Sequence, residues 1–462
     1  MSFKKGIVTI LLANILNLFF QLLTNFLLPK YLTIECYAEI KTFQLYVSYA
    51  GALHLGYCDG MYIKYGGKSL GDIDSNELKT DAMTLAVFQF VLLILLLTAS
   101  IFMHSAILAA FAAAILPLNM VSYYNLLFQA TGEFGAYSKV INVTTIATFI
   151  VNMGLLALQC FSEYHFFLLG YVVIDIFLML LCTSFLYTKK KELNSAKGTL
   201  SLACMRHNIK SGFFLMLGNF SSIILTGMDR WFIKILMDNT AFAMYSFAVS
   251  MENLMNVAVS PVSTTLYNFF CVHTDNNALK NIKGKIILFA TAIVACAFPA
   301  KFILETFLTK YLGSASVIFY LFGAQIFYII VKCFYVNLYK AQRRQKIYFV
   351  KLTAVIVIGF LFNAGLYAVM HTKEAFAIGT MLCGVVWYFL SELDFPQLRS
   401  GWRENIFLLL ATVSYLTFGT FMESLVGLLL YIAVLALLAL LLMKKDVMAC
   451  IQMVKDIINK KS

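Results

Sequence analysis

The sequence predicts an all-α integral membrane protein with about fourteen transmembrane helices, in two six-helix lobes plus a terminal helix pair. Of its 462 residues 61% are apolar and only 13% are charged, and the mean hydropathy is +0.83, far above that of soluble domains. The apolar residues also form long runs with short links between them. A hydrocarbon core about 30 Å thick needs roughly 20 apolar residues as helix, because lipid offers backbone groups no hydrogen-bond partner.

Six spans are predicted in the first lobe, at 7–28, 39–59, 80–102, 105–128, 137–159 and 163–187. Six more are predicted in the second lobe, at 208–228, 240–262, 284–306, 314–337, 347–370 and 374–394. The terminal pair is predicted at 404–421 and 424–443, and could instead be one hairpin that barely spans. The expected domains are an N-lobe at 1–187, a basic cytoplasmic linker at 188–207, a C-lobe at 208–394, terminal helices at 395–443 and a cytoplasmic amphipathic tail at 444–462.

The distribution of Lys and Arg predicts that both termini are cytoplasmic. With the amino terminus inside, 27 of the 35 Lys and Arg fall in cytoplasmic segments and 7 outside, and Lys332 lies within a span. Cytoplasmic loops retain basic residues during insertion, so this bias favours an even number of spans. The formal net charge of +12 is therefore a topology signal, and we expect no nucleic-acid partner.

Several enzyme classes are disfavoured because the chain has no soluble domain and no large extracytoplasmic loop. No HExxH, GxSxG or P-loop motif is present, and the ten cysteines form no CxxC pair. We expect no enzyme activity, metal or cofactor, and interpret the cysteines as small buried hydrophobic residues. Only His54 among the six histidines lies within a span, where interhelical hydrogen bonding is favoured over catalysis.

Ionisable residues deep in predicted spans are the first functional candidates, because each costs about 2.5–3.5 kcal/mol at a helix centre. Asp175, Glu252 and Lys332 occupy such positions. Lys332 is either a cation facing a cavity or a structural partner of Asp175 or Glu252. Glu252 and Asp175 are candidates for coupling to Na⁺ or H⁺, and the alternative for Glu252 is an interhelical hydrogen bond or ion pair.

The first predicted helix carries a polar stripe that spacing places on one face. Asn14, Asn17, Gln21 and Asn25 are separated by 3, 4 and 4 residues. Such amides can join neighbouring membrane helices, but a stripe this long favours a face that lines a central cavity.

Two motifs are similar to those of a transporter family. The segments Gly56–Lys68 and Gly227–Lys234, with the stretch Met244–Ser250, resemble segments of Wzx-type oligosaccharide-lipid flippases of the multidrug/oligosaccharidyl-lipid/polysaccharide exporter superfamily. The size, the even helix count and the two lobes fit this family as well. The chain departs from it in carrying no Lys or Arg on the first helix between Lys5 and Lys30.

The resemblance implies movement of undecaprenyl-diphosphate-linked oligosaccharide from the cytoplasmic to the outer leaflet of a bacterial cytoplasmic membrane, by alternating access, for O-antigen or capsule assembly. Membrane lipid is then a partner, and a polysaccharide polymerase is a candidate partner. Arg230, Lys332 and Lys41 are the expected diphosphate contacts, and the Asn face would bind sugar hydroxyls. Asp59 and Asp229 could instead be structural, paired with Lys64 and Arg230.

Two alternatives are kept beside this interpretation. A cation-coupled multidrug exporter of the same fold would use Asp175 and Glu252 centrally, whereas Lys332 would suit it poorly. A membrane sugar or acyl transferase is disfavoured, because it would need an extracytoplasmic domain that the sequence lacks.

Overall fold

The computed structural model describes the backbone of residues 3–272 and 275–459. It describes their side chains apart from those of residues 3–16, 268, 272 and 453–459. Within these ranges the chain is helical and contains no β-strand. Eleven of the described helices are long and apolar enough to cross a membrane. The protein is therefore a multi-pass membrane protein, as the sequence predicts.

The chain folds as two compact units, unit 1 from Met1 to Gly227 and unit 2 from Met228 to Ser462. The division falls within a single continuous helix, α8 (Leu202–Leu236). The predicted lobe boundary at the basic linker 188–207 lies earlier in the sequence, and it stays a prediction.

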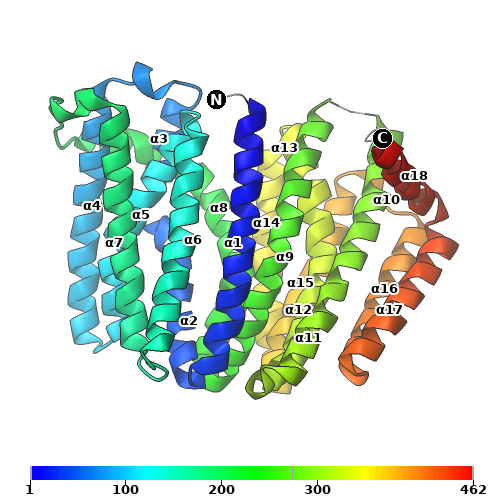
Figure 1. Cartoon of the computed structure of the whole chain (residues 1–462). Coiled ribbons are helices and arrows are strands. Elements are labelled where there is room, and N and C mark those ends of the chain that lie inside the picture. Colours follow the sequence, from blue (N-terminus) through cyan, green and yellow to red (C-terminus); the bar gives the residue numbers. More distant parts are fainter. Residues whose placement is uncertain (1–2, 273–274, 460–462) are drawn as a thin grey trace. The chain divides into compact units, whose positions relative to one another are not determined.

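Unit 1 is built around α5, which packs against α2, α3, α4, α6 and α7 (Figure 1). Its helices run in chain order as α1 (Phe3–Tyr31), α2 (Ile34–Ser48), η1 (Ala50–His54), α3 (Tyr57–Tyr65), η2 (Leu70–Asp72), α4 (Ser75–Phe102), α5 (Ala106–Ala130), α6 (Phe134–Ala157), α7 (Tyr164–Lys189), η3 (Lys191–Asn194) and the first part of α8. Side-chain caps fix several starts. Thr33 accepts from the backbone of Cys36 at 3.2 Å, and Ser105 accepts from that of Leu108 at 3.2 Å.

The second predicted span, 39–59, is broken. It consists of α2, η1 and α3, and the chain turns at Leu55 (φ 53°) and Gly56 (φ 86°). Glycine adopts positive φ without the steric cost that a side chain brings. The helical pattern in the sequence predicts one continuous helix here, and the positive φ angles at this pair of residues explain the difference.

Glycines hold α3 and α8 in close contact. A Cβ on Gly60 would lie 2.0 Å from the carbonyl oxygen of Asn208, and a Cβ on Gly212 would lie 2.1 Å from that of Gly56. Small residues let two helix backbones approach this closely in membrane proteins. Gly56 and Gly60 of the Gly56–Lys68 motif thus serve helix packing.

Unit 2 is built around α12, which packs against α9, α10, α15 and α16. The most apolar window of the segment Thr309–Ala341, which contains α12, is 89% buried. After the end of α8 the unit contains α9 (Asn239–Val272), α10 (Asn276–Ile293), η4 (Val294–Cys296), α11 (Ala297–Thr306), η5 (Thr309–Ser314), α12 (Ala315–Ile330), the π-helix η6 (Val331–Val336), α13 (Asn337–Ala341), α14 (Gln345–Met370), α15 (Lys373–Leu393), η7 (Pro396–Leu398), α16 (Trp402–Phe421), α17 (Ser424–Leu442) and α18 (Lys444–Asn459).

The eleven membrane-length helices coincide with eleven predicted spans. The other three predicted spans, 7–28, 39–59 and 240–262, fall on α1, on the broken α2–α3 segment and within α9. The count of fourteen therefore stays a prediction. The helix that carries the predicted seventh span, α8, continues beyond residue 228 through Asp229 and Arg230 to Leu236.

The close contact between α3 and α8 predicts that Gly212→Ala destabilises the protein by about 1–3 kcal/mol, because the added methyl group overpacks a backbone contact. The measurement is the unfolding temperature of the purified protein in detergent. Gly218→Ala is the matched control on the same helix, because a Cβ there meets no atom within 4 Å. Equal unfolding temperatures for the two variants would contradict the packing described here.

Candidate functional site

A cluster of charged side chains lies in unit 2, where the end of α8 packs on α9. Asp229 is 4% exposed, and its carboxylate accepts from the Tyr245 hydroxyl at 2.5 Å and from the backbone N–H of Arg230 at 2.7 Å. The Tyr245 bond ties α8 to α9, and both bonds satisfy a buried charge. The structural alternative for Asp229 is supported, although Tyr245 supplies the side-chain bond rather than Arg230.

The guanidinium group of Arg230 has an unused hydrogen-bond donor. Its Nε is buried, and no hydrogen-bond partner is found for it within the described ranges. The guanidinium interacts electrostatically with Asp229 and Glu252. A buried donor without a partner costs free energy, so this group is a candidate for contact with a ligand.

Glu252 lies in the interior of α9 and accepts a short hydrogen bond from the side-chain amide of Gln325 on α12. It also interacts electrostatically with Asp229, Lys332 and Arg230. Glu252 is thus the carboxylate that links the charged groups of α8, α9 and η6.

Lys332 lies in the π-helix η6, a rare local geometry that is frequent at functional sites. Its side chain is partly exposed, and its Nζ lies 5.8 Å from the centre of the Tyr328 ring. It interacts electrostatically with Glu252 at longer range. It forms no ion pair within 4.0 Å with any described carboxylate. Asn337 fixes the local backbone by donating to the carbonyl oxygens of Ser263 at 2.8 Å and Cys333 at 3.0 Å.

Unit 2 therefore brings together three of the predicted site residues, Arg230, Lys332 and Glu252. The sequence analysis missed two polar residues of this cluster, Tyr245 and Gln325. Tyr245 lies in the Met244–Ser250 stretch, and Gln325 is a lone amide within an apolar run. Both residues could therefore have been selected as candidates from the sequence.

Two other predicted site residues, Lys41 and Asp175, lie in unit 1. The Nζ of Lys41 donates to Gln44 at 3.0 Å and lies 5.2 Å from the centre of the Tyr37 ring. Asp175 lines a cavity of 190 Å³ together with Gln44 and Tyr171. Lys41 thus bonds a residue that lines the same cavity as Asp175.

The predicted polar face of α1 is unevenly buried. Asn17 is 7% exposed, and its Oδ1 has no described partner. Asn25 is partly exposed and Gln21 is exposed, whereas the side chain of Asn14 lies outside the described residues. The cavity-lining role of this face stays a prediction.

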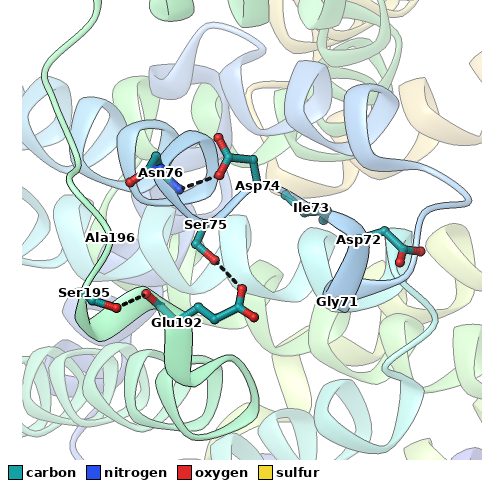
Figure 2. Close-up of a pocket in the computed structure, with 9 residues that line it drawn as sticks. All are labelled: Gly71, Asp72, Ile73, Asp74, Ser75, Asn76, Glu192, Ser195 and Ala196. Carbon is teal, nitrogen blue, oxygen red and sulfur yellow. Dashed lines mark hydrogen bonds between the residues drawn. The ribbon is translucent and has the colours of Figure 1, made fainter.

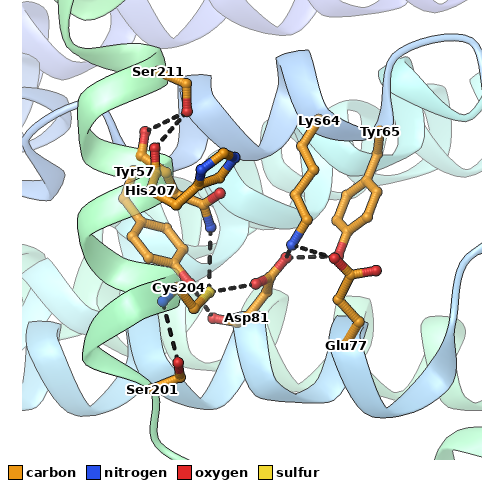
Figure 3. Close-up of polar contacts among 10 residues, drawn as sticks. Tyr57, Lys64, Tyr65, Glu77, Asp81, Ser201, Cys204, His207 and Ser211 are labelled. Carbon is orange, nitrogen blue, oxygen red and sulfur yellow. Dashed lines mark hydrogen bonds and ion pairs between the residues drawn. The ribbon is translucent and has the colours of Figure 1, made fainter.

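A buried acidic residue that the sequence analysis missed, Asp81, organises one end of unit 1 (Figure 3). Its side chain is fully buried and accepts from the Lys64 Nζ at 2.8 Å, the Tyr65 hydroxyl at 2.6 Å and the Cys204 thiol at 2.6 Å. Burial lowers the pKa of Lys64, but hydrogen bonds to Asp81 and Glu77 outweigh it and leave that pKa raised. Lys64 therefore stays protonated within this network.

The suggested pairing of Asp59 with Lys64 is wrong, because Lys64 is held by Asp81 and by Glu77 at 2.8 Å. Asp59 instead accepts from the Asn219 amide at 3.4 Å, and its Oδ2 lies 4.0 Å from the Nε2 of His54. Asp59 and Lys64 are five residues apart, so α3 directs them to different neighbours.

The basic linker is docked on unit 1. The Nζ of Lys190 is buried and donates to the carbonyl oxygens of Leu70 at 3.1 Å and Gly71 at 3.0 Å.

Beside Lys190 lies a polar pocket of 490 Å³, where Ser75 donates to Glu192 at 3.1 Å (Figure 2). The described residues contain no group of three His, Cys, Asp or Glu side chains that could hold a metal ion. We assign this pocket to the anchoring of the linker.

No known protein-family model matches the sequence, and no curated protein matches it either.

Solved transporter structures share the fold. The lipid II flippase MurJ in an inward closed conformation aligns with a TM-score of 0.60 at 15% identity, covering 96% of this chain and 99% of MurJ. An inward-facing multidrug resistance MATE family transporter of the MOP superfamily aligns with a TM-score of 0.58 at 12% identity, covering 82% of this chain and 95% of that transporter. A MATE structure in complex with MaL6 aligns with a TM-score of 0.56 at 13% identity, covering 86% of this chain and 97% of the MATE chain. The chain therefore has the fold of MOP superfamily transporters.

The Asp81 network predicts a structural role for the Lys64 end of the motif. Asp81→Asn should lower the free energy of unfolding by about 3 kcal/mol, because it removes one partner of a buried ion pair. Thermal unfolding of the purified variant is the measurement. Glu77→Gln is the control, with an expected cost of about 0–1 kcal/mol for a more exposed pair. A stable Asp81→Asn protein that fails only in transport would refute the structural assignment.

Proposed function

We propose that this protein is a flippase that moves a polyprenyl-diphosphate-linked oligosaccharide from the cytoplasmic to the outer leaflet of the bacterial cytoplasmic membrane, for O-antigen or capsule assembly. The proposal includes fourteen spans, two cytoplasmic termini and alternating access. A polysaccharide polymerase is its candidate partner. The observation that carries the proposal is the pair of cations, Arg230 and Lys332, clustered around Glu252 in a fold shared with a lipid II flippase.

The chemistry of the cargo supports this assignment. A diphosphate cannot enter hydrocarbon unaided, so a transporter must offer it cationic hydrogen-bond donors in place of water. Arg230 has an unpartnered buried Nε, and Lys332 is partly exposed without a close described ion pair. Both cations therefore have capacity for phosphate oxygens, and Lys41 of unit 1 is the third proposed contact.

The extent of the structural likeness also supports a lipid-linked cargo. The alignment with MurJ covers 96% of this chain, whereas the alignments with the two MATE structures cover 82% and 86% of it. The flippase thus accounts for more of the chain than the exporters do.

Glu252 supplies a means of coupling transport to an ion. Asp229 and Glu252 carry two negative charges, which formally balance Arg230 and Lys332. Binding of H⁺ or Na⁺ at Glu252 would leave the cluster with one net positive charge and favour an anionic head group. Asp175 is the second proposed coupling site.

The second candidate function is a cation-coupled multidrug exporter. It is supported by the MATE neighbours and by the two acidic residues, Asp175 and Glu252. A cationic drug cannot accept hydrogen bonds from Arg230 and Lys332 as a phosphate can, so the donors of the cluster favour the flippase.

Replacing either cation should stop transport. In vesicles that contain the purified protein and fluorescently labelled undecaprenyl-diphosphate-linked oligosaccharide, Arg230→Ala and Lys332→Ala should each slow flipping at least about tenfold, because a charge-assisted contact contributes about 1.5–3 kcal/mol. Protein yield and unfolding temperature should be unchanged.

Lys340→Ala is the matched control for these variants, because Lys340 is an exposed cation on the helix that follows η6. If both cluster variants flip at the wild-type rate, the diphosphate assignment is wrong. If wild-type vesicles export a lipophilic cation but do not flip the lipid, the exporter is the correct function.

Coupling through Glu252 is tested with the isosteric variant Glu252→Gln. The amide can still accept from Gln325 but cannot change its charge, so we expect a folded protein whose flipping no longer responds to an imposed H⁺ or Na⁺ gradient. The measurement is the ratio of flipping rates with and without the gradient. Asp175→Asn is measured in parallel, and a ratio lost only in that variant would move the coupling site to unit 1.

A further inference from the structure

We infer that a pocket inside unit 1, lined by both polar and apolar side chains, binds sugar. The pocket has a volume of 380 Å³, within the range of small-molecule sites. None of its lining residues belongs to the charged cluster of unit 2 or to the predicted substrate-binding and ion-coupling residues. The inference rests on the proposed function, because a lipid-linked oligosaccharide supplies the sugar.

One face of α5 forms much of the polar wall. Ser122, Asn125 and Gln129 line the pocket, at helical spacings of three and four residues. Tyr137 of α6 and Asn219 of α8 line it as well. Three helices thus direct neutral polar side chains into one cavity.

These side chains have unused hydrogen-bonding capacity. The Oδ1 of Asn125 is buried without a described partner. The side chains of Ser122, Gln129 and Tyr137 make no hydrogen bond to any other described residue. Buried polar groups in native proteins are nearly always bonded, so the Asn125 oxygen, with three partly exposed unused side chains beside it, indicates a polar occupant.

The remaining polar wall is held in a fixed arrangement. The Nδ1 of His54 accepts from the backbone N–H of Gly56 at 3.1 Å, so the neutral imidazole carries its proton on Nε2. That Nε2 lies 4.0 Å from Asp59, whose other oxygen accepts from Asn219 at 3.4 Å. Asp59 can therefore still accept from an occupant.

The composition of the wall identifies the class of ligand. None of the described lining residues is Lys or Arg, which argues against a phosphate. Amides and hydroxyls both donate and accept, as the hydroxyl groups of a sugar do. The apolar surfaces of Phe220 and Ile223 complete the lining and suit the C–H faces of a sugar ring.

The test compares two soluble or dispersed probes with the full-length protein in detergent. One probe is the free repeat-unit oligosaccharide released from the host's surface polysaccharide, and the other is undecaprenyl diphosphate without sugar. Asn125→Ala and Gln129→Ala should each weaken oligosaccharide binding about fivefold to tenfold, and leave undecaprenyl diphosphate binding unchanged.

A second readout separates ligand binding from folding. Because the side chains of Asn125 and Gln129 bond no other described residue, neither variant should lower the unfolding temperature. Thr145→Ala is the control, because Thr145 lies on α6, bonds only its own helix at the Ile141 carbonyl oxygen and does not line the pocket.

The outcomes distinguish this inference from the proposed function. Unchanged oligosaccharide binding in both pocket variants, with intact binding by the wild type, would overturn the sugar pocket and leave the flippase standing. Failure of the wild type to bind either probe would overturn both. Weakened binding of a lipophilic cation in the pocket variants, without an effect on the oligosaccharide, would assign the pocket to an exporter.

Discussion

The cost of placing charge in apolar helices governs how this chain is organised. An ionisable side chain buried among apolar helices must find a partner, and two networks in this chain provide several partners each. Asp81 is held by Lys64, Tyr65 and Cys204, and in unit 2 the buried Lys283 pairs with Glu392 at 2.6 Å. Such satisfied pairs join helices within a unit and leave little capacity for a ligand.

The groups at the two proposed sites differ from these pairs, because they are not fully satisfied. Arg230 keeps an unpartnered Nε, Lys332 lies in a π-helix without a close described ion pair, and Asn125 presents a buried oxygen to a cavity. Unused hydrogen-bonding capacity is costly in a membrane protein, so it is informative about binding. The cationic hydrogen-bond donors of unit 2 suit phosphate, and the neutral donors and acceptors of unit 1 suit sugar. A lipid-linked oligosaccharide contains both groups.

Long apolar runs were sufficient to predict the helical membrane fold, because every spanning segment must satisfy its own backbone. It could not predict the break at Leu55 and Gly56, or the continuation of α8 through Asp229 and Arg230, since both depend on tertiary contacts. Depth within a span drew attention to Glu252 and Lys332. Their grouping with Arg230 requires the packing of α8, α9 and η6, which the sequence does not reveal.

The measurement that tests the central claim most directly is the fate of lipid-linked oligosaccharides after deletion of the gene in its host. The account predicts that complete repeat units accumulate on undecaprenyl diphosphate in the cytoplasmic leaflet, and that the intact gene restores their export. Truncated repeat units would indicate a transferase instead. An unchanged lipid pool, with new sensitivity to cationic drugs, would contradict the flippase and favour the exporter.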